Sequence, residues 1–454
     1  MEKRIEKDVF GEVIIPKDKM WGTQTQRSLE NFPIGIEKMP KEFVHAYTLI
    51  KKAAARANNE VGKLSEEKAK AIQNASNQIL ADKWTEEFPL SIWQTGSGTQ
   101  TNMNLNEVIS EIAKQKLQYE NLHPNDDVNM GQSTNDTFPT AIHIAGAVKI
   151  NDQLLPVLEK FKKTLEALEK RYENTIKLGR THLQDATPIT FGQEVSGWRE
   201  MVQQNINMIQ QSLPALLTLP LGGTAVGTGL NAQPDFPKKA ISYIAKWTEL
   251  PFQESSNKFH GLTSKDAVMN THGALQTLAS NTMKIANDIR WLASGPRGGF
   301  SEINIPANEP GSSIMPGKIN PTQAEALTMV CVQIMGNHTT ISIAASQGNF
   351  ELNAYMPVIA YNFLQSIRLL TDSLDSFNER CLKGLEANEE KMLENVKQSL
   401  ALATALAPHI GYEKASIIAQ KADQEKLSLR EAALQSEIIT EEEFDEYIDL
   451  SKMV

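Results

Sequence analysis

Apolar residues recur along most of this chain at the spacing of amphipathic helices, and runs that alternate apolar with polar residues are few. The first predicted helices cover residues 41–61, 65–80 and 106–117, and Asn104 and Asn106 are interpreted as residues at the start of the third. The pattern therefore predicts a mostly α-helical protein.

The middle of the chain predicts a group of unusually long helices. The apolar stripe of residues 138–172 continues in register beyond Pro156, which predicts a kink and not an end. Further long patterns cover residues 190–213, 263–292, 322–346 and 355–377. Helices of this length depend on one another to bury their apolar faces, so they predict a bundle.

The pattern changes again after about residue 388, where the predicted helices become shorter and richer in Glu and Lys. The sequence therefore predicts three domains for the whole chain. They are an N-terminal helical domain at 1–134, a central long-helix bundle at 135–387, and a small C-terminal helical domain at 388–454. The glycine-rich residues 221–229 lack both the Gly-Lys-Ser/Thr of a P-loop and the spacing of a dinucleotide fingerprint. They are interpreted as a connector between helices.

Bulk composition narrows the class of protein. The 454 residues suffice for about three domains, and 41% hydrophobic with 22% charged residues is ordinary for a soluble protein. A formal net charge of -10 argues against a nucleic-acid partner. It does not argue against an anionic substrate, because nearby groups set the field at a site.

The two cysteines, Cys331 and Cys381, are too few for a disulfide framework or an iron–sulfur cluster, and no zinc-ligand spacing is present. No metal or other cofactor is therefore expected. The charged N-terminus has no apolar core typical of a signal peptide, and the longest uncharged stretch, residues 201–234, is interrupted by prolines and glycines. We expect no membrane partner and a cytoplasmic protein.

The most informative segment is Gly311–Pro321, with the sequence GSSIMPGKINP. Its glycines and prolines predict a loop, and Pro321 is placed to open the helix that follows. The loop carries two hydroxyls, an ammonium and a carboxamide beside that helix N-terminus, which suits a carboxylate substrate.

This loop resembles the signature of the fumarase/aspartase superfamily, and within it the class II fumarases. Four further blocks match the family in its order: Ser97–Asn104, His123–Asn129, Ser133–Asp136 and Thr181–Pro188. The resemblance covers nearly the whole chain. It implies a homotetramer in which the long helices of four chains form one helical core, and active sites that three subunits share.

The resemblance also implies roles for the reactive residues. Ser312 would be the base that removes the carbon proton, although from the residues alone a hydrogen-bond donor is an equal alternative. Lys318 and the N–H groups of the loop could stabilise its alkoxide. His182 would activate water, with Glu325 orienting it, unless Glu325 is only a carboxylate at a helix start. Apart from His123, the remaining histidines are interpreted as structural: His45, His143, His260, His272, His338 and His409.

The reaction that the resemblance implies is reversible anti-addition of water to fumarate, giving (S)-malate in the tricarboxylic acid cycle, through a carbanion or aci-carboxylate intermediate. The substrate is a small dicarboxylate, and neutral donors suit a dianion that must be released. The substrate-binding residues would be Ser97, Gly98, Thr99, Ser133, Thr134, Asn135, Thr181, Ser313, Lys318 and Asn320.

A secondary anion site of the family would correspond to His123, Pro124, Asn125 and Asp126. This chain departs from the family there, because Glu120 replaces an arginine commonly found three residues before the histidine. A carboxylate in that place would weaken anion binding, so the second site is doubtful.

Other functions remain as alternatives. Aspartate ammonia-lyase performs the same type of elimination, but the loop and the blocks at 97–99, 185–188 and 322–325 favour fumarase. Argininosuccinate and adenylosuccinate lyases share only the outline of the loop. A non-catalytic helical scaffold, as in the lens crystallins of this superfamily, would predict eroded catalytic positions, yet Ser312, Lys318, Asn320 and His182 are all present.

Overall fold

The structure is a computed structural model and describes residues 2–454. It confirms a mostly α-helical chain, accompanied by four small two-stranded sheets. Contacts divide the described chain into two compact units. The first comprises the N-terminal stretch through Pro156 with Asn205–Ala279 and Val330–Thr371, and the second comprises Val157–Gln204, Ser280–Met329 and Asp372–Val454.

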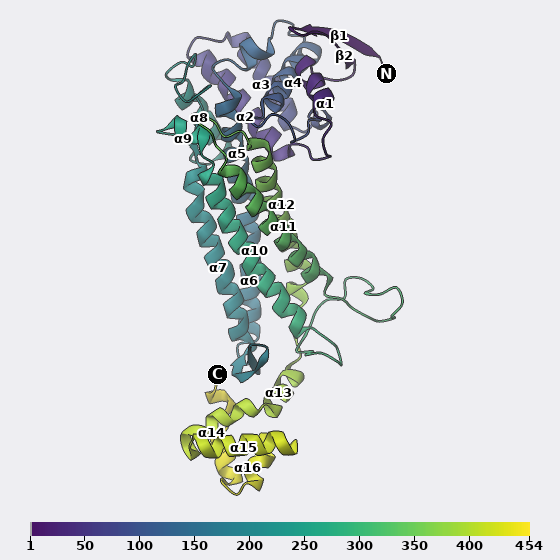
Figure 1. The fold of residues 1–454 in the computed structure, drawn as a ribbon, viewed down its shortest axis with the longest axis vertical. Coiled ribbons are helices and arrows are strands. Elements are labelled where there is room, and N and C mark those ends of the chain that lie inside the picture. Colours follow the sequence, from purple (N-terminus) through teal and green to yellow (C-terminus); the bar gives the residue numbers. More distant parts are fainter. Residues whose placement is uncertain (1) are drawn as a thin grey trace. The chain divides into compact units, whose positions relative to one another are not determined.

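The first unit begins with an antiparallel hairpin, followed by a cluster of helices (Figure 1). Its elements up to the middle of the chain are β1 (Lys3–Asp8), β2 (Gly11–Pro16), α1 (Thr23–Asn31), α2 (Lys41–Glu60), α3 (Glu66–Leu80), α4 (Thr99–Leu117) and α5 (Thr134–Lys149). Later it adds α8 (Phe236–Thr248) and α9 (Lys258–Thr263). Ser65 caps α3 by accepting a hydrogen bond from the backbone N–H of Lys68, so the predicted start of this helix is confirmed.

The third predicted helix begins earlier than expected. Asn104 and Asn106 lie inside α4 and are buried, so their interpretation as helix-start residues is wrong. The helix starts after Gly98, whose φ of 77° is left-handed, and the Gln94 side chain accepts the N–H and the hydroxyl of Thr101. The start of this helix carries buried, hydrogen-bonded polar residues, so the pattern of hydrophobic positions does not reveal it.

The irregularity predicted at Pro156 occurs just before it. One π-helical turn, Ile150–Leu154, separates α5 from α6 (Leu155–Arg171). Proline lacks an N–H and its ring opposes the carbonyl four residues earlier, so the chain widens there and then resumes as an α-helix.

The long helices are confirmed as α7 (Phe191–Leu216), α10 (Asp266–Leu292), α11 (Thr322–Ala345) and α12 (Met356–Arg380). Within the first unit, His272 of α10 contacts His338 of α11 and Ser366 of α12, which ties three helices together. Within the second unit, Phe161 of α6 stacks on Phe377 of α12. None of the helices in the described chain is long and apolar enough to span a membrane.

The C-terminal part of the second unit contains α13 (Glu389–Gln398), α14 (Ala403–Ile410), α15 (Tyr412–Glu425), α16 (Leu429–Gln435) and α17 (Glu441–Tyr447). Figure 1 shows α14, α15 and α16 gathered into one group. Apolar residues of these helices, among them Leu406, Ile418 and Phe444, form their own buried cluster. The domain boundaries drawn at 134 and 387 stay predictions.

Candidate active site

The loop between β7 (Ile303–Asn304) and α11 closes on itself. The N–H of Gly311 donates to the carbonyl of Lys318 over 2.9 Å, and the Asn320 amide donates to the carbonyl of Gly311. A side chain at Gly311 would come within 2.4 Å of the Lys318 carbonyl oxygen, so the loop closes in this way only with glycine there. Asn320 therefore lies at the neck of the loop, while Ser313 and Lys318 are exposed on it.

Ser312 lies at the start of this loop with its hydroxyl oxygen in a nest of backbone N–H groups. Its Oγ accepts hydrogen bonds from the N–H of Ile314 at 3.2 Å and of Met315 at 3.0 Å. Two dipoles aimed at one oxygen stabilise negative charge on it. Glu325 is exposed on the first turn of α11, and it lines a cavity of about 630 Å³ together with Lys318 and Asn320.

His182 occupies the tip of a second hairpin, formed by β3 (Ile176–Thr181) and β4 (Gln184–Thr190). Its φ is 58° and that of Leu183 is 59°, so both central residues of a two-residue turn are left-handed. Such a turn favours Asn-Gly, and a His-Leu pair there is strained. Strain of this kind concentrates at functional sites, and the turn leaves both Thr181 and His182 exposed.

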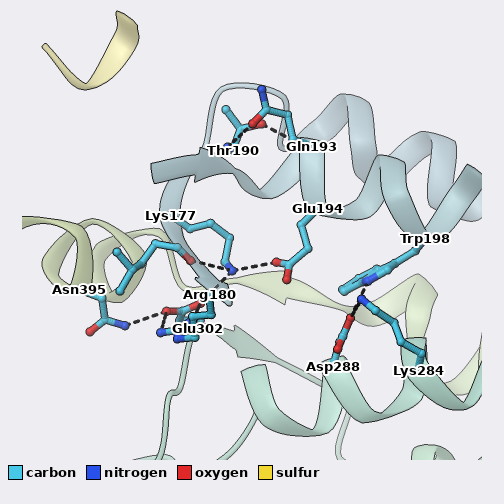
Figure 2. Close-up of polar contacts among 11 residues, drawn as sticks. Lys177, Arg180, Thr190, Gln193, Glu194, Trp198, Lys284, Asp288, Glu302 and Asn395 are labelled. Atoms are coloured by element: carbon cyan, nitrogen blue, oxygen red, sulfur yellow. Dashed lines mark hydrogen bonds and ion pairs between the residues drawn. The ribbon is translucent and has the colours of Figure 1, made fainter. Parts of the chain in front are cut away.

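An ion network around the buried Glu302 anchors strand β3 of this hairpin (Figure 2). The guanidinium of Arg180 donates to both oxygens of Glu302 at 3.1 and 2.6 Å, and the Asn395 amide donates to the same carboxylate at 2.9 Å. Lys177 lies between Glu302 at 3.4 Å and Glu194 at 2.8 Å. Glu302 directly precedes β7, so one carboxylate holds the hairpin of His182 and the segment that leads to Ser312.

The start of α7 fixes the base of the hairpin, where Thr190 pairs with Ile176. Thr190 and Gln193 exchange hydrogen bonds, since the N–H of each donates to the side-chain oxygen of the other at 2.9 and 3.0 Å. One helical turn later, the indole of Trp198 donates to Asp288, which also pairs with Lys284 (Figure 2). The hairpin therefore emerges from a rigid support although its tip is exposed.

In the first unit, the structure brings the blocks at 97–102 and 129–136 together. Asn102 Nδ2 donates to Thr134 Oγ1 at 2.9 Å and to Asn129 Oδ1 at 3.1 Å. Ser97 and Thr99 share a hydrogen bond of 2.8 Å at the start of α4. Gly98 lies against Phe138, since a Cβ there would approach its ring to 2.1 Å.

The turn before α5 is a capping box. Ser133 accepts from the N–H of Asn135 at 3.2 Å and its own N–H donates to Asp136 at 2.9 Å. Thr134 is buried, whereas Ser133 and Asn135 are partly exposed. The glycine-rich connector completes this arrangement, because the N–H groups of Gly222 and Thr224 donate to the second oxygen of Asp136.

The secondary anion position differs in character. His123 Nδ1 accepts from the N–H of Asp126 at 3.1 Å, on a π-helical turn that begins at Pro124. The adjoining cavity of about 570 Å³ is lined by His123, Pro124, Asn125 and Glu120, by the basic residues Arg4, Lys7 and Lys114, and by the further carboxylates Glu6, Asp8, Glu107 and Glu111. This surplus of acidic groups opposes an anion there.

The described residues contain no group of three or more His, Cys, Asp or Glu side chains arranged to hold a metal ion. The 97–102 and 129–136 blocks belong to the first unit, and the 182 hairpin and the 311–325 segment belong to the second.

Comparison with known proteins identifies the family. Residues 11–336 match the family described as Lyase, and residues 402–454 match the fumarase C C-terminus. Class II fumarate hydratases of Bacillus cereus and Halalkalibacterium halodurans are 58% and 59% identical over 458 residues, covering 100% of this chain and 99% of each relative. The class II fumarase structure from Schistosoma mansoni superposes with a TM-score of 0.97 at 42% identity, covering 100% and 99% of the two chains.

The chain belongs to the class II fumarate hydratase family. The resemblance seen in the sequence blocks is confirmed, as is the prediction that the chain is a lyase with this family's helical fold. The roles assigned to Ser312, His182 and the other residues of the fumarate hydratase site remain proposals.

Sequence reasoning missed several members of these networks. Lys51, buried on α2, donates to Asn129 and Gln132 beneath the 133–135 turn, and Glu302 joins two segments of the second unit. Asn102 and Asn129 lie inside blocks that resemble the family and could have been found there. Lys51 and Glu302 carry no local signal, because their partners lie far away in the sequence.

We expect Glu302→Gln to lower the free energy of unfolding by about 3 kcal/mol, since it leaves the buried Lys177 and the partly buried Arg180 with one carboxylate fewer. Denaturant unfolding at neutral pH measures the loss. The surface variant Glu441→Gln, which weakens an exposed pair with Arg430, is the control and should change stability by less than about 1 kcal/mol. Equal losses would contradict the anchoring role.

The stability difference between the wild type and the Glu302→Gln variant should also depend on pH. Burial by itself raises the pKa of Glu302, but the hydrogen bonds from Arg180 and the charge of Lys177 outweigh it and hold this pKa below its usual value. A lowered pKa stabilises the fold above the unfolded value and loses that effect as pH falls through the folded value. The stability difference between the wild type and E302Q should therefore shrink on acidification below about pH 4.

Proposed function

We propose that this chain catalyses the reversible anti-addition of water to fumarate, giving (S)-malate, as a cytoplasmic enzyme of the tricarboxylic acid cycle. The observation that carries the proposal is the backbone nest around Ser312 Oγ in the loop between β7 and α11. Serine is a very weak base unless its alkoxide is stabilised, and two N–H donors with the ammonium of Lys318 in the same loop supply that stabilisation.

In the hydration direction, His182 takes a proton from water as the water oxygen attacks one alkene carbon. The electron pair of the double bond moves to the other carbon and into its carboxylate, which forms an aci-carboxylate. The Ser312 hydroxyl then gives its proton to that carbon and becomes the alkoxide. Solvent returns a proton from His182 to Ser312, and Glu325 orients the imidazole.

The substrate carboxylates would be bound by the ammonium of Lys318 and the amide of Asn320 on one side. Neutral donors would bind them on the other: Ser97, Gly98, Thr99, Ser133, Thr134, Asn135, Thr181 and Ser313. Thr134 acts from within the buried network, through its bond from Asn102. The chemistry needs no cofactor, since proton transfer and charge stabilisation account for every step.

The sites would be shared in a homotetramer. The homotetramer is supported by the apolar surface that the long helices leave exposed. Examples are Met208 of α7 and Val332 and Ile343 of α11, together with Ile314 and Ile319 on the loop. Exposed apolar surface of this extent is typical of a surface that another chain covers.

Fumarate absorbs in the ultraviolet, so the purified protein can be tested directly. We expect fumarate to form from malate without ammonium, and the rate to persist after exhaustive chelation. Turnover of aspartate alone would reassign the chain to ammonia elimination, and no turnover with malate, fumarate or aspartate would support a non-catalytic scaffold. Loss of activity on chelation would contradict the absence of a metal.

A further inference from the structure

Lys51 is a fully buried lysine on α2 that forms no ion pair within the described part of the chain. Its Nζ donates to Asn129 Oδ1 at 2.9 Å and to Gln132 Oε1 at 3.1 Å, and it lies 5.3 Å from the centroid of the Tyr47 ring. Two neutral amides and an aromatic face therefore surround an ammonium group in the protein interior.

Such a group is costly to bury, because a charge without a counterion loses its hydration. Burial lowers the pKa of Lys51 to about 7, and the charge of Asp136 opposes this shift. The Asp136 carboxylate is itself committed to the N–H groups of Ser133, Gly222 and Thr224, and burial raises its pKa to about 6. Packing alone would be satisfied by methionine, which has a similar length and no charge.

The ammonium lies directly behind the proposed substrate-binding segments. Gln132 adjoins Ser133 at the turn before α5. Asn129 Oδ1 also accepts a hydrogen bond from Asn102, whose amide donates to Thr134 as well. Asn102 Oδ1, although buried, has no hydrogen-bond partner among the described residues. The network is thus rich in polar groups on the side that faces the 97–102 and 133–135 segments.

We propose that Lys51 is a positioning and specificity-determining residue, which supplies from behind the amide layer the positive charge that a dicarboxylate requires. The inference rests on the proposed function. Ser97, Thr99 and Asn135 are neutral, so they orient a carboxylate without balancing its charge. An ammonium one hydrogen-bond layer away attracts a dianion across a poorly hydrated interior, where a charge acts more strongly than in water. It also fixes the amides of Asn129 and Gln132.

This role predicts a particular kinetic change. Fumarate and malate are both dianions, so a charge behind the site stabilises both ground states and the transition state to a similar extent. Lys51→Met should raise KM for fumarate and for malate about tenfold or more, and kcat should change by less than about threefold. Lys51→Gln keeps a hydrogen-bond donor without the charge and should raise KM similarly.

The matched control is Lys52→Met. Lys52 is the next residue of α2, but its ammonium lies over the ring of Trp247, 4.4 Å from the centroid, so removing it should leave KM unchanged. A purely structural Lys51 would instead give variants of lower melting temperature with an unchanged KM in the folded fraction. Near wild-type KM in both K51M and K51Q would overturn the inference and leave the proposed function intact.

A binding measurement separates the two proposals. Calorimetric titration of succinate, a saturated dianion, should give a dissociation constant about tenfold larger for K51M than for the wild type. If the wild type shows no turnover but binds succinate with this loss in K51M, the proposed function fails and the role of Lys51 stands. If the wild type neither turns over malate nor binds succinate, both fail.

Discussion

Ser312→Ala should lower kcat for malate dehydration by about 10³-fold while the protein keeps its fold. The substitution removes only the hydroxyl group, and the backbone N–H groups of Ile314 and Met315, which donate to that hydroxyl oxygen, can stay in place. Alanine fits the loop, because the closure between Gly311 and Lys318 uses main-chain atoms. Ultraviolet absorbance of fumarate measures the rate, and the melting temperature checks the fold.

Ser313→Ala is the comparison that makes this result specific. Ser313 is the adjacent residue of the same loop and is assigned only to substrate binding, so its variant should raise KM and retain most of kcat. Turnover of S312A within about tenfold of the wild type would remove the role of base from Ser312. The backbone N–H groups would then act on the substrate and not on an alkoxide.

The sequence was most informative where periodicity is strong. The helices α7, α10, α11 and α12 have long apolar faces, so their existence and approximate ends could be predicted. The two β-hairpins could not be predicted in this way. The strand β1 consists largely of charged residues that are exposed or half-buried, with Arg4 donating to the carbonyls of Pro16, Lys19 and Trp21. The β3–β4 turn carries His-Leu in place of the usual Asn-Gly signal.

The candidate site was predictable to the extent that its residues lie in compact blocks. The 311–321 loop concentrates hydroxyls, an amide and an ammonium between glycines and prolines, and that local composition indicates function. Glu302 and Lys51 are different, because the local sequence around each of them does not distinguish it from an ordinary charged residue. Only the contacts with Arg180 or with Asn129 and Gln132 distinguish them, and such contacts depend on the tertiary fold.

His182→Asn should lower kcat by about 10²- to 10⁴-fold, the usual contribution of general acid–base catalysis. Asparagine is the informative substitution, because it tolerates the left-handed φ of 58° at this turn and still removes the imidazole. The pairing of Arg180 with Glu302, which anchors β3, is unaffected. Leu183→Asn is the matched control, since it relieves the neighbouring strained position and should leave turnover close to wild type. If both variants lost activity equally, turn geometry and not the imidazole would be responsible.

The same two variants can test whether the site is shared between chains. S312A and H182N would each be inactive alone. When they assemble at random in mixed tetramers, a site that takes Ser312 and His182 from different subunits is intact in about a quarter of cases. A site that takes both from one subunit is never intact. We therefore expect the co-assembled protein to recover about a quarter of wild-type turnover, whereas the separately purified variants, mixed without subunit exchange, recover none. Absence of recovery in verified mixed tetramers would place both residues in a site formed by a single chain.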